Sequence, residues 1–167
     1  MNIVLKFIQY LAKKLIAIAV LIWLAVLVTF TAYDCANIYI VVTEGMTQRA
    51  TAVLEGQENV VLNKFFTSSY LNSDPLLNNN QYEDFIIPDY NLKLSIKWLW
   101  AWPWSNSARV VIEEEIPKIV AKPRSQEDQD NKTPSPWQNG EKIILLQKRA
   151  GLWKIDGIIF KKPLNGE

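Results

Sequence analysis

Residues 15–30 read LIAIAVLIWLAVLVTF and contain no charged side chain, and uncharged residues continue as far as Tyr33. A helix needs about 20 consecutive apolar residues to cross a hydrocarbon core of about 30 Å. The stretch meets that requirement before Asp34 ends it, so it predicts a transmembrane helix over residues 15–33. This helix would divide the rest of the chain into an arm of residues 1–14, a juxtamembrane segment of residues 34–42 and a folded domain of residues 43–167.

The charges around this segment predict its orientation. Lys6, Lys13 and Lys14 precede it, and the first 33 residues contain no acidic residue. Because flanking basic residues are retained on the cytoplasmic side, we expect the N-terminus in the cytoplasm and the domain outside it. The sequence therefore predicts a single-pass protein of the cell (plasma) membrane, with the lipid bilayer as one partner.

A cleaved export signal is the alternative for the same segment. Signal peptides have an apolar core of about 7 to 15 residues and a small-x-small cleavage site. The site ending at Ala32 has Phe30 two residues before it, and the site ending at Ala36 has Asp34. Lipid attachment at Cys35 would require small residues before the cysteine, and the two preceding residues are large or charged. An uncleaved anchor is therefore favoured.

Composition limits the classes of function. The 134 residues after position 33 suffice for one compact domain. They carry 15 basic residues, 18 less the three before the span, against 17 acidic ones, a net charge of about −2. The basic residues are dispersed, so no nucleic acid is expected. The chain has no histidine, which excludes a nucleophile activated by imidazole and an ordinary zinc site. Its one cysteine, Cys35, excludes an internal disulfide. We expect no metal and no cofactor.

Between residues 33 and 72 apolar positions recur every three or four residues, which predicts half-buried helices. One stripe comprises Met46, Ala50, Val53 and Leu54, and a second comprises Val61, Leu62, Phe65, Phe66, Ser69 and Tyr70. Gly45 and Gly56 predict one or two breaks or kinks, and Pro75 ends the helical pattern. A short helical turn is expected next, around Tyr82, Phe85 and Ile86 and closed by Pro88.

The juxtamembrane segment 34–42 is unusually apolar for an exposed stalk, with Ile38, Ile40, Val41 and Val42. Two interpretations remain open for it. It extends the membrane helix outward and supplies a surface for self-association, or it packs on its own domain.

From Asn91 the period changes to two, which predicts a long strand. Its even positions form an apolar stripe of Leu92, Leu94, Ile96, Trp98, Trp100, Trp102 and Trp104. A turn near residues 105–107 leads to a second strand over 109–116. Pairing even with even residues continues the stripe into Val110, Ile112 and Ile116, because a slip by one residue would set tryptophan beside glutamate. The same register places Glu114 on the apolar face.

The C-terminal region predicts a loop and a hairpin. Residues 121–140 are mostly polar with three prolines and are expected to form a flexible loop. Residues 141–149 and 152–160 then read as two strands around Ala150–Gly151. A two-residue turn would pair Leu146 with Ile155 and Lys148 with Trp153. Within the loop, residues 131–133 form a glycosylation sequon only if the source is eukaryotic.

Helices followed by an antiparallel sheet that closes on such a hairpin resemble the nuclear transport factor 2-like superfamily. The residues that carry the resemblance are VLNKFFTSSYL at 61–71 and GLWKIDGI at 151–158, and the likeness extends from about residue 43 to 161. It implies an α+β fold in which helices pack on a curved antiparallel sheet to form a cone.

Following one N-terminal span, this domain resembles the bitopic scaffold subunits of bacterial conjugation and type IV secretion systems. Anchored modules in sporulation and cell-wall proteins of Gram-positive bacteria are related. The resemblance implies an extracytoplasmic module that self-associates and binds other envelope membrane proteins, so an assembly role is favoured and no enzyme is expected.

Two other functions stay open. An anchored ligand-binding domain would use the tryptophan face, although tryptophans also fill cores, and Trp102 and Trp104 would also suit the membrane interface. An isomerase or dehydratase would place Tyr70, Tyr90, Asp89 and Glu114 in the cone, where an apolar cavity raises a carboxyl pKa. The candidate binding residues are therefore Trp98, Trp100, Trp102, Trp104, Glu114, Tyr70 and Tyr90.

The run Glu113–Glu115 cannot converge on one cation, because neighbouring strand residues point to opposite faces.

Overall fold

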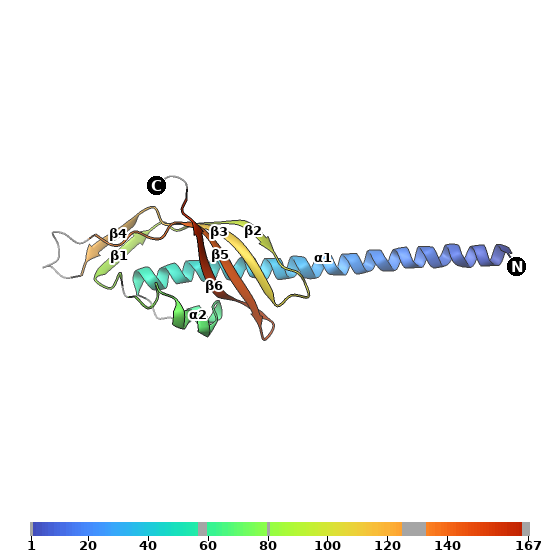
Figure 1. The fold of residues 1–167 in the computed structure, drawn as a ribbon, viewed down its shortest axis with the longest axis horizontal. Helices are drawn as coiled ribbons and strands as arrows, with labels where there is room; N and C mark the ends of the chain where they lie inside the picture. The colour runs from blue at the N-terminus through green and yellow to red at the C-terminus, as the bar shows by residue number, and fades with distance from the viewer. Residues whose placement is uncertain (1, 57–59, 80, 125–132, 165–167) are drawn as a thin grey trace.

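The structure is a computed structural model that describes residues 2–56, 60–79, 81–124 and 133–164. The helical elements are α1 (Asn2–Glu55), the 3-10 helix η1 (Val61–Lys64) and α2 (Ser68–Ser73). The strands are β1 (Phe85–Tyr90), β2 (Lys93–Trp100), β3 (Ser107–Glu115), β4 (Ile119–Pro123), β5 (Gly140–Arg149) and β6 (Leu152–Lys162). A long helix followed by antiparallel sheets confirms the predicted α+β class (Figure 1).

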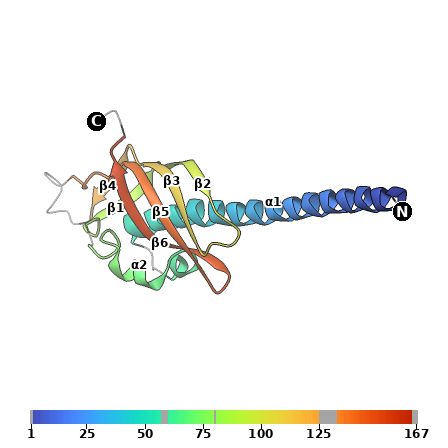
Figure 2. The same cartoon turned by 45° about the vertical axis from the view of Figure 1, so that its right-hand side comes forward.

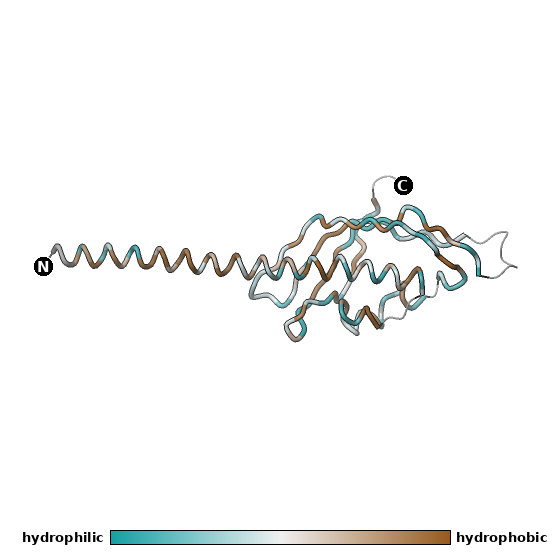
Figure 3. Tube along the Cα trace, turned by 180° about the vertical axis from the view of Figure 1, so that it is seen from behind, coloured by the Kyte–Doolittle hydropathy of each residue, from teal (hydrophilic) through white to brown (hydrophobic). Residues whose placement is uncertain are grey.

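Helix α1 projects far beyond the domain at its N-terminal end (Figure 1). Its part from Leu5 to Phe30 is almost entirely exposed, and it is predominantly apolar as it approaches the domain (Figure 3). Among the described residues, this is the one helix long and apolar enough to cross a membrane.

The C-terminal part of α1 packs on the domain. Ile38, Val42 and Met46 are fully buried, and their spacing of four residues places them on one helix face. The helix thus packs on its own domain before residue 43, as the second interpretation of the segment 34–42 expected.

The predicted break at Gly45 is wrong, because α1 continues through it. A Cβ atom at this position would lie 3.0 Å from both Phe65 Cβ and Ile155 Cδ1. Glycine therefore allows a close approach of Phe65 and Ile155 to the helix here and does not produce a kink. Gly56, with φ +67°, follows the last helical residue, as predicted.

The second predicted helical stripe is divided. Phe66 makes a bridge with Ile155 of β6 between η1 and α2, and Thr67 caps α2 by accepting a hydrogen bond from the Tyr70 amide. Leu62, Phe66 and Tyr70 are still buried together, so the apolar pattern is correct although the helix is interrupted.

The helical turn predicted around Tyr82, Phe85 and Ile86 is correct only at its start, because residues 81–84 form a turn in which the Phe85 amide donates to the Tyr82 carbonyl, whereas Phe85 and Ile86 are extended. Residues Phe85–Tyr90 form strand β1, which pairs with β4 in a separate two-stranded antiparallel sheet. The partner strand lies about thirty residues later, so only a long-range contact selects the extended conformation.

The larger sheet has the order β2-β3-β5-β6, with all neighbours antiparallel. The even register is confirmed from Leu94 opposite Glu114 to Ile96 opposite Ile112. A bulge at Lys97 then shifts the pairing, so that Trp98 lies opposite Val111 and Leu99 opposite Val110. Because one extra residue reverses the side-chain alternation, Leu99 faces the core and the tryptophans that follow the bulge do not.

The β5–β6 hairpin agrees with its prediction. Leu146 pairs with Ile155, and Lys148 pairs with Trp153. Ala150 and Gly151 have φ values of 49° and 82°, the positive pair that a tight two-residue turn requires.

The predicted loop 121–140 is correct only in part. Strand β4 occupies its first residues as far as Pro123, and Trp137 is buried in the core beside β1 and β4. Residues 125–132, and with them most of the sequon, lie outside the described residues.

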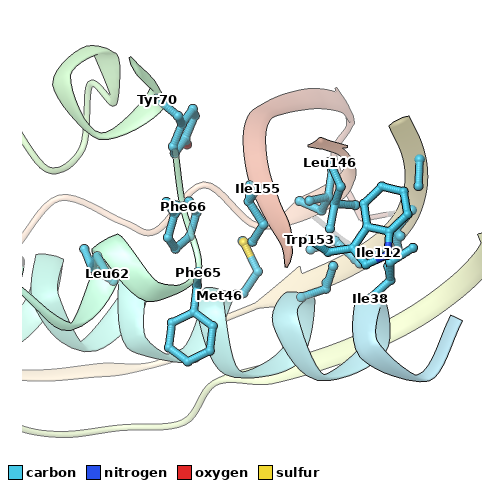
Figure 4. Close-up of a cluster of buried hydrophobic side chains, with 14 of the residues drawn as sticks. Ile38, Met46, Leu62, Phe65, Phe66, Tyr70, Ile112, Leu146, Trp153 and Ile155 are labelled. Atoms are coloured by element: carbon cyan, nitrogen blue, oxygen red, sulfur yellow. The ribbon is translucent and has the colours of Figure 1, made fainter. Parts of the chain in front are cut away.

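Two hydrophobic clusters surround the inner half of α1. In the first, Ile38 and Met46 of α1 contact side chains of β6, β3 and the segment before α2 (Figure 4). The second comprises Ala50, Val53, Leu54, Tyr82, Phe85, Ile87, Ile116 and Trp137. The strands curve over α1, and α2 lies near the β6 side of the domain (Figures 1 and 2).

Candidate functional site

The tryptophans of the predicted stripe lie on the surface. Their exposed fractions are 53% for Trp98, 43% for Trp100, 52% for Trp102 and 68% for Trp104. The structure therefore excludes the core interpretation for Trp98 and Trp100. The bulge at Lys97 explains the difference for these two residues, because it places them on the sheet face opposite the core.

We call Trp100, Trp102 and Trp104 the tryptophan ladder. The rings of Trp100 and Trp102 meet edge to face at 5.4 Å, and those of Trp102 and Trp104 stack at 5.1 Å between centroids. These separations are typical of favourable aromatic pairs, so the ladder is one continuous aromatic surface.

The ladder forms one wall of a groove of about 450 Å³, and α1 forms the other. The helix contributes Leu24, Leu27, Val28, Thr31, Ala32 and Cys35 to the lining, and the ladder is joined by Pro103. The groove is thus apolar on both sides and lies beside the predicted membrane segment.

The face of the large sheet that points away from α1 also carries an apolar strip. We call it the outer band: Trp98, Val111, Ile143 and Ile159. Register places them opposite one another across β2, β3, β5 and β6. Trp98 and Ile159 at the two edges are about half exposed, and the two central residues are partly buried.

Ion pairs border the outer band at the end of the sheet farther from the ladder. Lys97 pairs with Glu113 at 2.7 Å, and Lys93 pairs with Glu115 at 3.2 Å. Glu141 accepts a hydrogen bond from Lys161, which holds the pKa of its carboxyl below the usual range. This end of the outer face is therefore charged, and at the ladder end Arg109 is exposed opposite Trp100.

A second group of candidate residues lies inside the domain. Arg49 of α1 donates to both carboxylate oxygens of Asp74, with Nε to Oδ2 at 2.5 Å and Nη2 to Oδ1 at 2.9 Å. Burial alone would raise the pKa of the Asp74 carboxyl, but the Arg49 hydrogen bond and charge outweigh it and the net shift is downward. Tyr70 lies beside this pair, and burial raises the pKa of its hydroxyl.

Glu114 lies on the apolar face, as the register predicted, and is fully buried. Its partner is Lys142 on the neighbouring strand β5. Burial lowers the pKa of Lys142, and the charge of Glu114 offsets part of that shift. Lys142 Nζ also lies 5.7 Å from the Trp137 ring centroid, and Glu114 Oε1 is buried without a hydrogen-bond partner.

Arg49, Asp74, Glu114 and Lys142 are each at most 4% exposed. Two cations and two anions are thus paired beneath the surface, and the arrangement presents no open acid–base site. Each buried charge needs its partner, because removing one side chain of an ion pair leaves the other charge buried without a counter-charge and destabilises the fold.

The remaining candidates are separate from this cluster. The Tyr90 hydroxyl lies 2.8 Å from Thr51 Oγ1, and Asp89 is exposed on β1. The structure therefore brings Tyr70 near the buried charges but does not bring Tyr90 or Asp89 into one pocket with them. Among the described residues, no group of three or more His, Cys, Asp or Glu side chains is placed to hold a metal.

Sequence reasoning missed one polar contact beside the predicted membrane segment. Asp34 is buried, and its Oδ1 accepts from Lys148 Nζ and from Trp153 Nε1, both at 2.9 Å. The available signal was an acidic residue on the same helix face as Ile38, since a carboxylate on a packed face requires a partner.

Comparison with known proteins gives one distant structural similarity to report. The chain is similar to a nuclear transport factor 2-like (NTF2-like) protein of unknown function from Shewanella baltica OS155, with a TM-score of 0.43 and 13% sequence identity. The alignment covers 74% of this chain and 91% of that chain. No family model and no curated protein matches the sequence. The α+β assignment rests on the elements described above.

Proposed function

We propose that this chain is a single-pass membrane-anchored module whose α+β domain lies outside the cytoplasm and takes part in assembling an envelope complex. One observation carries the proposal: the outer band is an apolar strip across a sheet whose other face is already covered by α1. The favoured partners are other envelope membrane proteins or a second copy of the chain.

Helix α1 supports the anchoring. Its residues 15–30 are almost all exposed and contain no charged side chain, as expected for a helix in lipid. Lys6, Lys13 and Lys14 lie on its N-terminal side, which favours a cytoplasmic location for that end.

The division of the outer sheet face supports a binding role. Scattered apolar residues are ordinary on a surface, but a contiguous apolar patch with a polar rim is typical of an interface. The outer band continues through Trp100 into the ladder, while ion pairs limit it on the other side. Tryptophan is also among the residues that contribute most to interfaces.

The buried charges favour assembly over catalysis. Arg49 with Asp74 and Glu114 with Lys142 are closed to solvent and paired. A general acid or base must reach its substrate within hydrogen-bonding distance, and these groups are occupied by one another.

The assembly proposal is tested by site-specific photo-crosslinking of the full-length chain in its native membrane. A photoreactive residue at Val111, in the outer band, should give a discrete adduct that is lost on Trp98→Ser or Ile159→Ser. The same probe at Ser69, exposed on α2, is the control and should give none. An unchanged adduct in both serine variants, or no adduct at Val111, contradicts the proposal.

Topology is tested separately by protease protection of intact cells or spheroplasts, with a tag at each end of the chain. We expect external protease to remove the C-terminal tag and to leave the N-terminal one. The reverse result would place the domain in the cytosol and overturn the anchored orientation.

A second candidate function, binding of a small apolar ligand, is favoured by the groove between α1 and the ladder. Native mass spectrometry of the full-length chain released from detergent micelles tests it. A bound molecule that is lost on Trp102→Ser would support this function, and a ligand-free mass would contradict it.

A further inference from the structure

The position of the domain relative to the apolar helix is defined by direct contacts. Helix α1 continues without interruption from the apolar part into the packed part. Where the two parts meet, Asp34 joins the helix to Lys148 of β5 and Trp153 of β6. A domain attached in this way does not turn freely about a flexible stalk, so each of its surfaces has a defined relation to the bilayer.

The ladder is the part of the domain that lies beside the predicted span. Its groove is lined by α1 from Leu24 to Cys35, a length of about 16 Å at the helical rise of about 1.5 Å per residue. That length is close to half the thickness of a hydrocarbon core of about 30 Å. The rings therefore lie at the level of the bilayer leaflet on the domain side, if residues 15–33 span the membrane as proposed.

The chemistry of this segment matches that location. Residues 98–108 contain no charged side chain, and the rings of the ladder are about half or more exposed. Indole rings favour the interfacial layer of a membrane, where the ring contacts apolar chains and its N–H reaches polar groups. The ion pairs of the outer face lie beyond the outer band, and the charged residue nearest the ladder in the sheet is Arg109, which is opposite Trp100 on β3.

We infer that the tryptophan ladder is a second membrane contact, seated in the interfacial layer of the leaflet on the domain side, with lipid chains occupying its groove. The groove is continuous with the membrane segment, because that segment forms one of its walls. The contact holds the sheet at a constant tilt and keeps the outer band at the membrane surface. The inference rests on the proposed span but not on the assembly role.

The inference is tested by fluorescence quenching in the full-length chain, reconstituted in vesicles of phosphatidylethanolamine and phosphatidylglycerol. In a Cys35→Ser background, an environment-sensitive dye is attached at Asn106→Cys, in the loop after the ladder. A lipid with a spin label near its headgroup should quench this dye several-fold more strongly than a dye at Ser95→Cys, which is exposed farther along β2. A water-soluble quencher should show the opposite order.

Ring substitutions provide matched variants. Replacing Trp102→Ser together with Trp104→Ser should reduce lipid quenching at Asn106→Cys to the level at Ser95→Cys. Trp98→Ser, which removes an equally exposed ring outside the groove, should leave it unchanged. Both tryptophan positions are exposed, and an unchanged far-ultraviolet circular dichroism spectrum confirms that the fold persists.

The outcomes separate this inference from the anchor. A dye at Val26→Cys reports the span itself, and its failure to be quenched by lipid would overturn the proposed anchor. Strong quenching there with equal quenching at Asn106→Cys and Ser95→Cys would overturn the ladder contact alone. Protection of the Asn106→Cys dye from both quenchers would assign the groove to protein rather than lipid and would also overturn it.

Discussion

The two parts of α1 differ in their surroundings although both are rich in apolar residues. In the first part Ile16, Leu21 and Phe30 are about 60% exposed, whereas in the second Ile38, Val42 and Met46 are fully buried. The first part is apolar on all sides, and the second is apolar on one face only. The comparison teaches that the distribution of apolar residues around a helix, more than their number, distinguishes packing against protein from exposure to lipid.

The threonine hydroxyl groups of α1 do not show this difference. Thr43, Thr47 and Thr51 lie on the polar side of the packed part and bond back to carbonyls of the preceding turn. Thr29 and Thr31 do the same within the apolar part. A threonine is therefore compatible with both environments, because the helix itself satisfies its hydroxyl.

The strongest test of this comparison places the same charge in each part. Val42→Asp buries a carboxylate with no partner and should destabilise the domain by more than about 4 kcal/mol. Val20→Asp should leave the domain folded and reduce membrane insertion, with a cost of about 3 kcal/mol near the helix centre. Protease resistance reports the domain, and carbonate extraction reports insertion. Equal loss of domain fold in both variants would show that the two parts are not separate environments.

The buried ion pair tests what the packed part contributes beyond apolar contact. Arg49→Met leaves Asp74 buried and unpaired, and we expect a loss of about 3 to 5 kcal/mol in the free energy of unfolding. Arg49→Met combined with Asp74→Leu should recover much of that loss, because no charge is then left alone. Chemical denaturation of the full chain in micelles measures both, and equal losses in the single and double variants would contradict the pairing.

The same pair predicts a dependence on acid. The folded state holds the pKa of Asp74 below its ordinary value of 3.8. As the pH falls, the unfolded chain therefore takes up this proton at a higher pH than the folded chain does. The stabilisation that the ionised Asp74 gives is present above about pH 4, and it is lost as the pH falls through the lower pKa of the folded state. Denaturation midpoints across this range should vary less in Asp74→Asn. Glu141→Gln removes a carboxyl whose pKa is also lowered, but its ion pair lies at the surface, where solvent screens it, so this variant should reduce the dependence less than Asp74→Asn does.

A steric test concerns the closest contact of the packed part. Gly45→Leu would push against Phe65 and Ile155, which approach the glycine closely, and overpacking costs about 1 to 3 kcal/mol. Thr47→Leu, exposed two residues later, should change stability by less than about 0.5 kcal/mol. A thermal unfolding midpoint unchanged in Gly45→Leu would mean that the contact relaxes without cost.

The smallest effect is expected on the charged side of the outer sheet face. Lys93 Nζ lies 3.2 Å from Glu115 Oε2, and the two side chains are 58% and 36% exposed. Exposed pairs contribute about 0 to 1 kcal/mol, so Lys93→Ala should leave the denaturation midpoint nearly unchanged. A large loss would show that this end of the sheet is buried in the assembled protein.

Local patterns predicted the elements whose contacts are close in sequence. Residues 15–33 and the β5–β6 hairpin depend on neighbouring residues, and the turn at Ala150–Gly151 sets the pairing of both strands. The placement of Glu114 on the apolar face followed from the same period-two reasoning. Its partner Lys142 did not, because the pairing of β3 with β5 brings together residues that are far apart in the chain.

The tryptophan stripe shows where sequence reasoning stops. An uninterrupted period of two predicted one face for all four rings, and a single bulge at Lys97 reversed the faces. Nothing in the residue types near Lys97 signals a bulge, since lysine is ordinary in strands with an exposed side. The extra residue is accommodated because Leu99 then reaches the core while the rings lie outside.

The sequence by itself determined an apolar segment long enough to span a bilayer, a following α+β domain and a closing hairpin, because hydrophobic periodicity and turn chemistry act over a few residues. Only the tertiary structure decided that α1 is continuous, that β1 pairs with β4, that Asp34 joins the helix to the sheet and that the ladder lies beside the apolar part of α1. These features depend on contacts between distant parts of the chain, and their free energies appear only when the packed surfaces meet.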